Sequence, residues 1–89
     1  MEDLIVNELY EKQSLAACIY LVMRGRELEF SYKENECFLS KDGSKKEYSL
    51  WIGKQEQAFE SLEELLQKAL IDNVKLMEIW QDIELGILY

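Results

Sequence analysis

The sequence predicts one α+β domain, in which an antiparallel sheet of three or four strands packs against two or three short helices. Three observations predict it: apolar and polar residues alternate through 26–52, a helical apolar stripe runs through 62–70, and the alternation returns over 83–89. With 89 residues the chain has room for a single domain, 1–89, and one modest core that all these segments must share.

The central segment is expected to form an antiparallel meander. Its strands are placed near 26–32, 36–41 and 46–52. Turns are predicted at Lys33-Glu34-Asn35, where Asn35 can accept a positive φ, and at Asp42-Gly43, a common hairpin turn. The positions expected on the apolar face are Leu28, Phe30, Tyr32, Tyr48, Leu50 and Ile52, with Trp51 on the other face. Other elements must cover the apolar face of such a sheet.

A helix is favoured over 15–24, although the run LAACIYLVM is apolar all round and has no usable period. Ser14 fits an N-cap, and Gly25 fits a left-handed helix stop. The β-branched and aromatic residues of the run keep a buried strand open as the alternative for 15–23.

The clearest helix signal lies after the meander. Ser61 followed by Glu64 has the pattern of a capping box. The apolar residues that then recur at helical spacing are Leu62, Leu65, Leu66, Ala69 and Leu70. This predicts a helix over 62–70 with Leu65 and Leu66 buried. Asn73 is expected to cap a second short helix, whose apolar stripe includes Trp80.

Both ends of the chain contain apolar residues. Residues 1–13 are interpreted as a helical extension, because several of their apolar residues would share one helical face. Over 83–89 the spacing of apolar residues changes from helical to every second residue, which predicts a C-terminal strand. Ile87 and Tyr89 are expected to pack on the core, with Glu84 on the opposite face.

The sequence lacks the usual signs of an enzyme. It contains no His, which removes Ser-His and Cys-His pairs and the commonest general base. It has no Gly-rich phosphate loop, and Cys18 and Cys37 lack metal-ligand spacing. We therefore expect no catalytic residues, no cofactor and no metal, and we interpret both cysteines as buried free thiols.

The cellular location is also addressed by the sequence. The longest apolar run, 15–23, is shorter than the roughly 20 residues that a membrane-spanning helix requires. The chain begins Met1-Glu2-Asp3, whereas a secretory signal begins with basic residues. An intact protein of the bacterial cytoplasm, with no membrane partner, is expected.

The formal net charge of −8 is unevenly distributed. Residues 55–89 carry −6, from eight acidic and two basic residues, whereas residues 24–54 carry +1, from six acidic and seven basic residues. A field of negative sign repels nucleic acid and attracts basic protein surfaces. The lysines at 41, 45 and 46 are interpreted as a solvated hairpin tip. The candidate partner-binding residues are Glu56, Glu60, Glu63, Glu64, Glu78, Asp82 and Glu84.

Three stretches resemble small acidic proteins of Firmicutes and their mobile elements. They are Gly25–Phe30, similar to a GREIEF strand start; Phe59–Leu66, with the pattern F-x-S-x-E-E-L-L; and Ile71–Glu84, with the pattern I-D-x-x-x-L-x-E-I-W-x-D-I-E. Together with the segments between them, the resemblance covers roughly two-thirds of the chain. It implies an α+β fold and a bacterial or phage setting, and it implies no activity.

The function that we favour from the sequence is a non-enzymatic inhibitor encoded by a phage or mobile element. Its acidic residues and exposed aromatic residues would occlude the cationic, nucleic-acid-binding surface of a host defence nuclease, as proteins that block CRISPR nucleases do. Two alternatives stay open: an immunity or antitoxin-like partner of one enzyme, and a self-associating adaptor domain with no inhibitory role.

Overall fold

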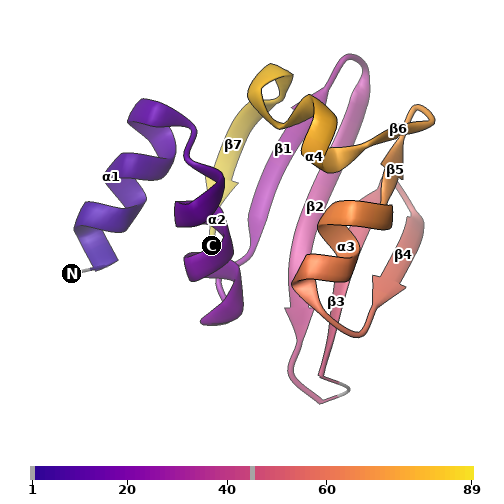
Figure 1. Ribbon diagram of the computed structural model, residues 1–89, viewed down its shortest axis with the longest axis horizontal. Helices are drawn as coiled ribbons and strands as arrows, with labels where there is room; N and C mark the ends of the chain where they lie inside the picture. The colour runs from indigo at the N-terminus through magenta and orange to yellow at the C-terminus, as the bar shows by residue number, and fades with distance from the viewer. Residues whose placement is uncertain (1, 45) are drawn as a thin grey trace.

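The structure is a computed structural model that describes residues 2–44 and 46–89 (Figure 1). Within these residues the chain forms four α-helices, one 3-10 helix, a five-stranded sheet and a two-stranded sheet. The α+β class is confirmed, with a larger sheet than the three or four strands expected. Lys45, which the sequence places in the hairpin tip, lies outside the described residues.

The main sheet has the strand order β4-β3-β2-β1-β7, and every neighbouring pair is antiparallel. Its strands are β1 (Leu28–Tyr32), β2 (Asn35–Asp42), β3 (Glu47–Ile52), β4 (Gln55–Phe59) and β7 (Glu84–Leu88). The predicted meander is therefore present as β1, β2 and β3, extended at one side by β4 and at the other by the chain end. A small second sheet pairs β5 (Leu70–Ile71) with β6 (Val74–Lys75).

The helices lie on one side of the main sheet. They are α1 (Glu2–Lys12), α2 (Leu15–Met23), α3 (Leu62–Lys68) and α4 (Leu76–Ile79), followed by the 3-10 helix η1 (Trp80–Asp82). Figure 1 shows α2, α3 and α4 in front of the sheet and α1 beside α2. We call the covered side the inner face and the opposite side the outer face. Buried residues of the inner face include Leu28, Phe30, Cys37, Leu39, Tyr48 and Leu50.

The structure resolves 15–23 as helix rather than strand. The Ser14 hydroxyl accepts a hydrogen bond from the Ala17 amide at 3.1 Å, which caps the first turn of α2. Gly25 has a φ of +93° just after the last turn, the left-handed conformation predicted for a helix stop. Helix α2 packs against both α1 and the sheet, so apolar residues occupy more than one of its sides and no clean period results.

The capped helix α3 also forms as predicted at its start. The Ser61 hydroxyl accepts from the Glu64 amide at 3.0 Å, and Leu65 and Leu66 are buried. The helix ends at Lys68, two residues before the predicted end. The reason is that the Gln57 side chain hydrogen-bonds both the amide and the carbonyl of Leu70, which holds that residue in an extended conformation.

Two predictions about local turns are wrong. Asn73 caps no helix: it has a φ of +66° in the turn between β5 and β6, and α4 begins after Lys75 without a side-chain cap. In the turn between β1 and β2 the positive φ belongs to Lys33, at +55°, and not to Asn35. The side-chain Nδ2 of Asn35 instead donates to the Tyr32 carbonyl at 3.3 Å, which stabilises the turn.

The chain end forms the predicted strand, β7, but its faces differ from the prediction. One residue of β1, Glu29, lies opposite two residues of β7, Gly86 and Ile87, because the register shifts between the two flanking pairs. This β-bulge adds one residue to the alternation. Ile87 and Tyr89 are consequently 57% and 54% exposed, so the prediction that they pack on the core is wrong.

The N-terminal segment is helical, as interpreted from the sequence, and it is tied to the C-terminal third. The side-chain amide of Gln13 donates to the Trp80 carbonyl at 2.8 Å, and the Trp80 indole N–H donates to the Gln13 carbonyl at 2.7 Å. The Tyr10 hydroxyl donates to the Gly86 carbonyl at 2.6 Å. These hydrogen bonds attach the end of α1 and the residue that follows it to η1 and β7.

Both cysteines are buried free thiols, as predicted. Burial raises the pKa of the Cys18 thiol from 9.0 to about 12, and that of Cys37 from 9.0 to about 11. Neutral thiols of this kind are poor nucleophiles at physiological pH. Cys18 and Cys37 therefore serve as small apolar residues of the core.

Candidate partner-binding face

The outer face of the main sheet is the most distinctive surface of the molecule. Within the described residues, the helices that pack on the sheet do so on the opposite side (Figure 1). Residues that pair across antiparallel strands share a face, so the strand registers assign each side chain. The outer face comprises Glu29, Ser31, Glu36, Phe38, Ser40, Asp42, Glu47, Ser49, Trp51, Glu56, Ala58, Glu84, Ile87 and Tyr89.

Three aromatic side chains form a row across this face. Phe38 of β2 lies directly opposite Trp51 of β3. The ring of Tyr89 meets that of Phe38 edge to face, with 6.0 Å between the ring centroids and 61° between the planes. Phe38 and Trp51 are half-buried by their neighbours, whereas Tyr89 is exposed. Aromatic residues are enriched at the energetic centres of protein interfaces.

Five glutamates surround the aromatic row. Each strand of the main sheet contributes one: Glu29, Glu36, Glu47, Glu56 and Glu84. None of the residues assigned to this face is Lys or Arg, and the ion pairs that the described residues form use Glu2, Glu8 and Asp72 instead. The lysines that follow the strands, at 33, 46 and 54, lie in turns at the sheet ends. The face is therefore uniformly anionic around an aromatic centre.

Hydrogen bonds fix two of these carboxylates. The Tyr89 hydroxyl donates to Glu29 Oε2 at 2.8 Å, and the Ser49 hydroxyl donates to Glu56 Oε2 at 2.5 Å. The bond to Glu29, followed by desolvation and the negative charges of Glu29 and Glu27, raises the pKa of Tyr89 above its usual value. Tyr89 therefore remains a neutral donor, and the carboxylate of Glu29 is held in place beside the aromatic row.

A shallow depression marks the β7 side of the outer face. It has a volume of about 350 Å³, and its lining includes Glu29, Ser31, Glu36, Glu84 and Ile87. No group of carboxylates or thiols among the described residues has an arrangement suited to a metal ion. The depression instead has the chemistry to accept a Lys or Arg side chain. Its three carboxylates match the charged head, and its apolar wall matches the alkyl stem.

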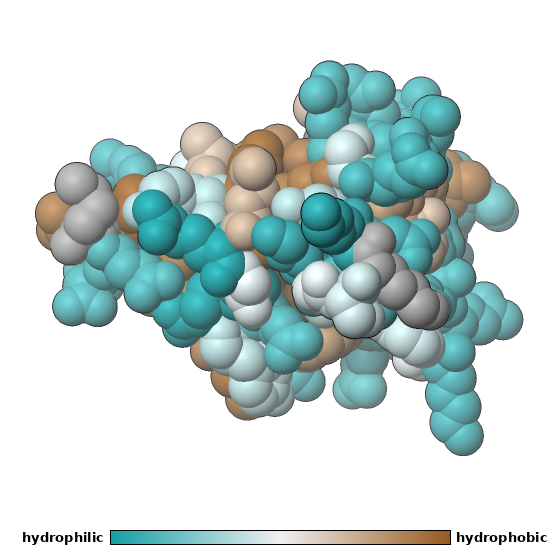
Figure 2. Space-filling view, turned by 90° about the horizontal axis from the view of Figure 1, so that it is seen from below, coloured by the Kyte–Doolittle hydropathy of each residue, from teal (hydrophilic) through white to brown (hydrophobic). Residues whose placement is uncertain are grey.

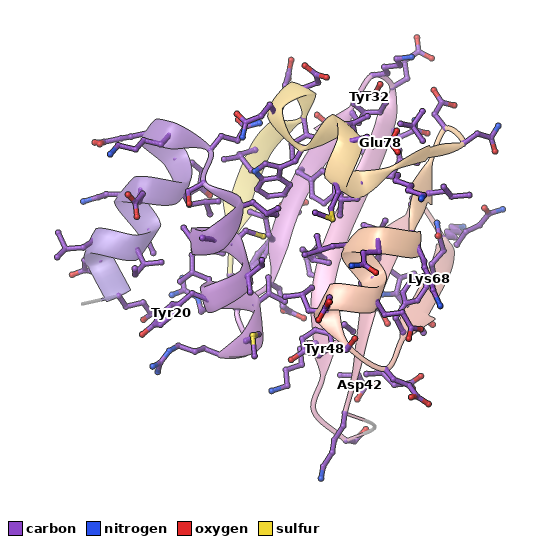
Figure 3. The ribbon with its side chains drawn as sticks, in the orientation of Figure 1. Tyr20, Tyr32, Asp42, Tyr48, Lys68 and Glu78 are labelled. Atoms are coloured by element: carbon purple, nitrogen blue, oxygen red, sulfur yellow. The ribbon has the colours of Figure 1, made fainter. Side chains whose placement is uncertain are left out.

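The seven acidic residues singled out from the sequence do not share one face. Glu56 and Glu84 lie on the outer face. Glu60 precedes α3 and Glu63 and Glu64 lie in its first turn, on the helical side of the sheet. The last two, Glu78 in α4 and Asp82 in η1, are also on the helical side, where Figure 3 shows Glu78.

Sequence reasoning missed three glutamates of the outer face: Glu29, Glu36 and Glu47. They belong to residues 24–54, which carry +1 overall, so charge summed along the chain conceals them. None of the lysines and arginines of that segment is assigned to the outer face, whereas its glutamates on this face alternate with apolar residues. Summing charge separately over the two faces of the meander would have revealed the anionic side.

No helix among the described residues has the length and apolar character to cross a bilayer. A comparison of the chain with protein-family models, with curated proteins and with solved structures finds no match.

Proposed function

We propose that this protein is a non-enzymatic inhibitor that binds a basic surface of another protein through its outer face. The observation that carries the proposal is the composition of that face: five glutamates around three aromatic residues, with no Lys or Arg assigned to it. A face of this composition is complementary to a surface rich in Arg and Lys, because both charge and cation–π attraction favour the contact.

The mechanism is occlusion. Glutamates of the outer face pair with Arg and Lys side chains that would otherwise hold phosphate groups, and the aromatic row fills the centre of the contact. The strands hold these side chains on a regular sheet, so little conformational entropy is lost on binding. The negative field also accelerates association with a cationic partner, and salt weakens this effect.

The target class that we propose is a nucleic-acid-binding enzyme, such as a host defence nuclease met by a phage or mobile element. A surface built to bind a phosphate backbone is rich in Lys and Arg, and it is the surface that an anionic protein face blocks best. The immunity-like and self-associating alternatives would be recognised in the experiment below by the identity of the protein that is recovered.

The test compares two variants of equal net charge that differ only in which face is changed. The outer-face variant is Glu36→Lys with Glu84→Lys, and the matched control on the helical side is Glu63→Lys with Glu78→Lys. All four residues are exposed. Wild type and both variants, tagged at the N-terminus, are used to capture proteins from a bacterial lysate at low and high salt, and captured proteins are identified by mass spectrometry.

We expect a basic, nucleic-acid-binding protein to be retained by wild type and by the control, and to be lost from the outer-face variant and at high salt. The captured partner is then purified and its binding to nucleic acid is measured. We expect wild type to abolish that binding and the outer-face variant to leave it intact. Equal retention by both variants would refute the assignment to the outer face. Recovery of only a second copy of this chain would support self-association instead.

A further inference from the structure

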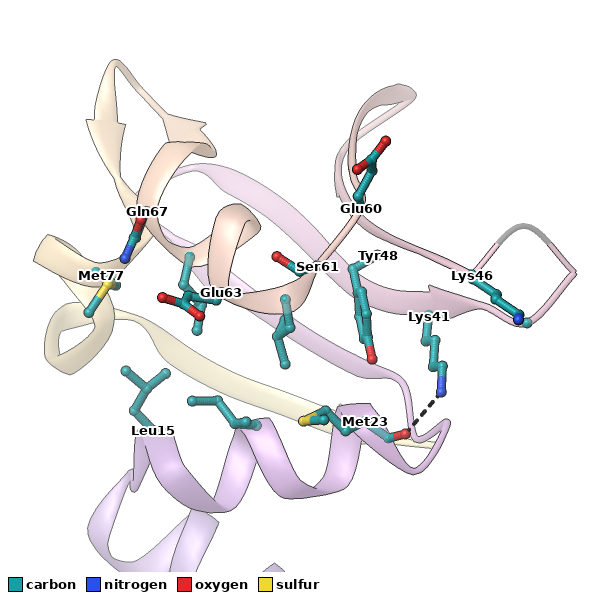
Figure 4. Close-up of a pocket in the computed structure, with 14 residues that line it drawn as sticks. Leu15, Met23, Lys41, Lys46, Tyr48, Glu60, Ser61, Glu63, Gln67 and Met77 are labelled. Carbon is teal, nitrogen blue, oxygen red and sulfur yellow. Dashed lines mark hydrogen bonds between the residues drawn. The ribbon is translucent and has the colours of Figure 1, made fainter.

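A groove on the helical side of the molecule has chemistry unlike that of the outer face. It has a volume of about 990 Å³ and lies between α2 and α3 (Figure 4). Its apolar lining includes Leu15, Ile19 and Met23 from α2, Leu62 and Leu66 from α3, and Met77 from α4. Figure 2, which views the molecule from below, shows apolar surface between the hydrophilic surfaces on either side. The helices thus leave part of the inner side open.

One end of the groove is cationic. Lys41 and Lys46 line it there, on either side of the β2–β3 turn. Lys41 Nζ donates to the Met23 carbonyl at 3.2 Å and lies 5.9 Å from the centroid of the Tyr48 ring. An ammonium has three donors, so this bond leaves two of them for another acceptor. Figure 4 shows the Tyr48 ring between the two helices, with its hydroxyl at the side where Lys41 and Met23 lie.

The other end of the groove carries no basic side chain among its lining residues. Leu15, Gln67 and Met77 lie there, opposite to the lysines (Figure 4). Met23 and Met77 are 54% and 50% exposed, which is high for such apolar side chains. Met side chains are flexible and adapt to ligands of varied shape. The two methionines therefore form adaptable walls along an apolar channel.

The acidic residues near the groove restrict where an anionic group could sit. Glu60 points away from α2 in Figure 4, and Glu63 lies on the α3 rim, nearer to Met77 than Lys41 is. An anion placed beside Glu63 would be repelled, whereas one placed between Lys41, Lys46 and the Tyr48 hydroxyl would meet positive charge and hydrogen-bond donors. The charges therefore favour a ligand whose anionic end lies at the lysines and whose other end lies toward Met77.

We propose that this groove binds a long-chain carboxylate, with its head at Lys41, Lys46 and Tyr48 and its alkyl tail along α2 toward Leu15 and Met77. The apolar walls account for the tail, and the two lysines account for the single anionic head. The volume is at the upper end of the range of about 300–1,000 Å³ that small-molecule sites occupy. The groove lies on the side of the sheet away from the outer face, so this proposal is independent of the inhibitor proposal.

The experiment uses two probes that share a chain and differ in charge: decanoate and 1-decanol. Each is titrated into the full chain below its aggregation limit, and the methyl resonances of Met23 and Met77 are followed by NMR. We expect decanoate to shift both methyl resonances in a saturable way, and to bind about tenfold more tightly than decanol, as a charge-assisted contact predicts.

Three variants test the roles of the lining residues. Replacing both lysines, Lys41→Gln with Lys46→Gln, should weaken decanoate binding about tenfold and leave decanol binding within about twofold. Tyr48→Phe should weaken decanoate binding by a smaller factor, because it removes the hydroxyl and keeps the ring. Met77→Glu should abolish binding of both probes, because it places a carboxylate in the channel.

Matched controls lie outside the groove. Lys33→Gln with Lys54→Gln changes the net charge by the same amount and should leave both affinities within about twofold, since these lysines are in distant turns. Leu4→Glu, at a residue that is 69% exposed in α1, is the control for Met77→Glu. Far-ultraviolet circular dichroism of every variant establishes that each one is folded.

The proposal is overturned if neither methyl resonance shifts up to the solubility limit of decanoate. It is equally overturned if decanol binds as tightly as decanoate to wild type. The same holds if replacing Lys33 and Lys54 weakens decanoate binding as much as replacing Lys41 and Lys46. A protein captured by wild type and lost from folded Met77→Glu, together with no decanoate binding, would show that the groove holds a polypeptide and would also reject the carboxylate proposal.

Discussion

The two faces of the main sheet are built from the same strands but from different kinds of residues. The inner face uses Leu, Phe and Cys side chains that helices bury, such as Leu39 and Leu50. The outer face presents Phe38, Trp51 and Tyr89 among glutamates, with no helix over them in the described part of the chain. The inner face thus contributes most of the buried apolar surface that stabilises the fold, whereas the outer face is the surface that we propose for binding.

Adjacent residues of β3 provide the strongest test of this comparison. Leu50→Ala should lower the free energy of unfolding by about 2–5 kcal/mol, because Leu50 is fully buried on the inner face and its truncation leaves a cavity. That is a large fraction of the roughly 5–15 kcal/mol available to a small domain. Trp51→Ala, one residue later on the outer face, should cost clearly less. Urea unfolding of both variants measures the difference, and equal losses would contradict the division of roles.

The bulge in β7 allows a test at the boundary of the two faces. Gly86→Ala should lower the free energy of unfolding by about 1–3 kcal/mol, because a Cβ atom there would lie 3.0 Å from the Glu29 carbonyl oxygen. The strain should also displace Glu29 from Tyr89, which amide chemical shifts of these residues would report. Unchanged stability together with unchanged shifts would mean that the bulge accommodates a Cβ atom at this position without strain.

The pH dependence of stability tests whether the two thiols of the core are shielded from solvent. The Cys18 and Cys37 thiols have pKa values of about 12 and 11 in the folded protein, against 9.0 when solvated. Above pH 9.0 the unfolded chain loses thiol protons that the folded chain keeps, so stability should fall as pH rises from about 9 toward 11. Urea midpoints for wild type and for Cys18→Ala with Cys37→Ala measure this contribution. If the double variant shows the same decline with pH as wild type, the thiols are not the cause.

The smallest effect is expected for charge reversal on the outer face. Glu36→Lys should change the free energy of unfolding by less than about 0.5 kcal/mol, and in the stabilising direction, because Glu36 lines one depression with Glu29 and Glu84. Added salt should stabilise wild type slightly more than the variant, since salt screens repulsion among these carboxylates. A marked destabilisation by Glu36→Lys at low salt would show that the carboxylate has a structural role.

Local signals were sufficient for most elements of the fold. Ser61, Ser14 and Gly25 are short-range markers whose hydrogen bonds and φ values depend on the few residues around them, and all three occur as predicted. Strand β4 was not predicted, because two of the three residues that it turns inward, Gln55 and Gln57, are polar and only Phe59 is apolar. The side-chain amide of Gln57 is satisfied by the backbone of Leu70, a contact that only the folded chain brings together.

The candidate face could not be predicted from the order of residues along the chain alone. The assignment of Glu29 and Glu36 to one surface with Glu84 depends on pairing β1 with both its neighbours. The exposure of Tyr89 depends on one extra residue in a bulge, which changes the side of every residue after it. Charge per segment therefore located only Glu56 and Glu84 correctly. The alternation of residues did place Trp51 on the face away from the core, but not Phe38 and Tyr89 beside it.

The position of Tyr89 has a practical consequence for anyone who handles this protein. Its ring and hydroxyl are engaged on the outer face, and its carbonyl accepts a hydrogen bond from Arg26 Nε at 2.5 Å. Any affinity tag or fluorescent fusion added after Tyr89 would begin at the rim of the candidate face and would shield it from a partner. A tag placed before α1 also begins close to this rim, because Glu2 forms an ion pair with the same Arg26 at 3.1 Å.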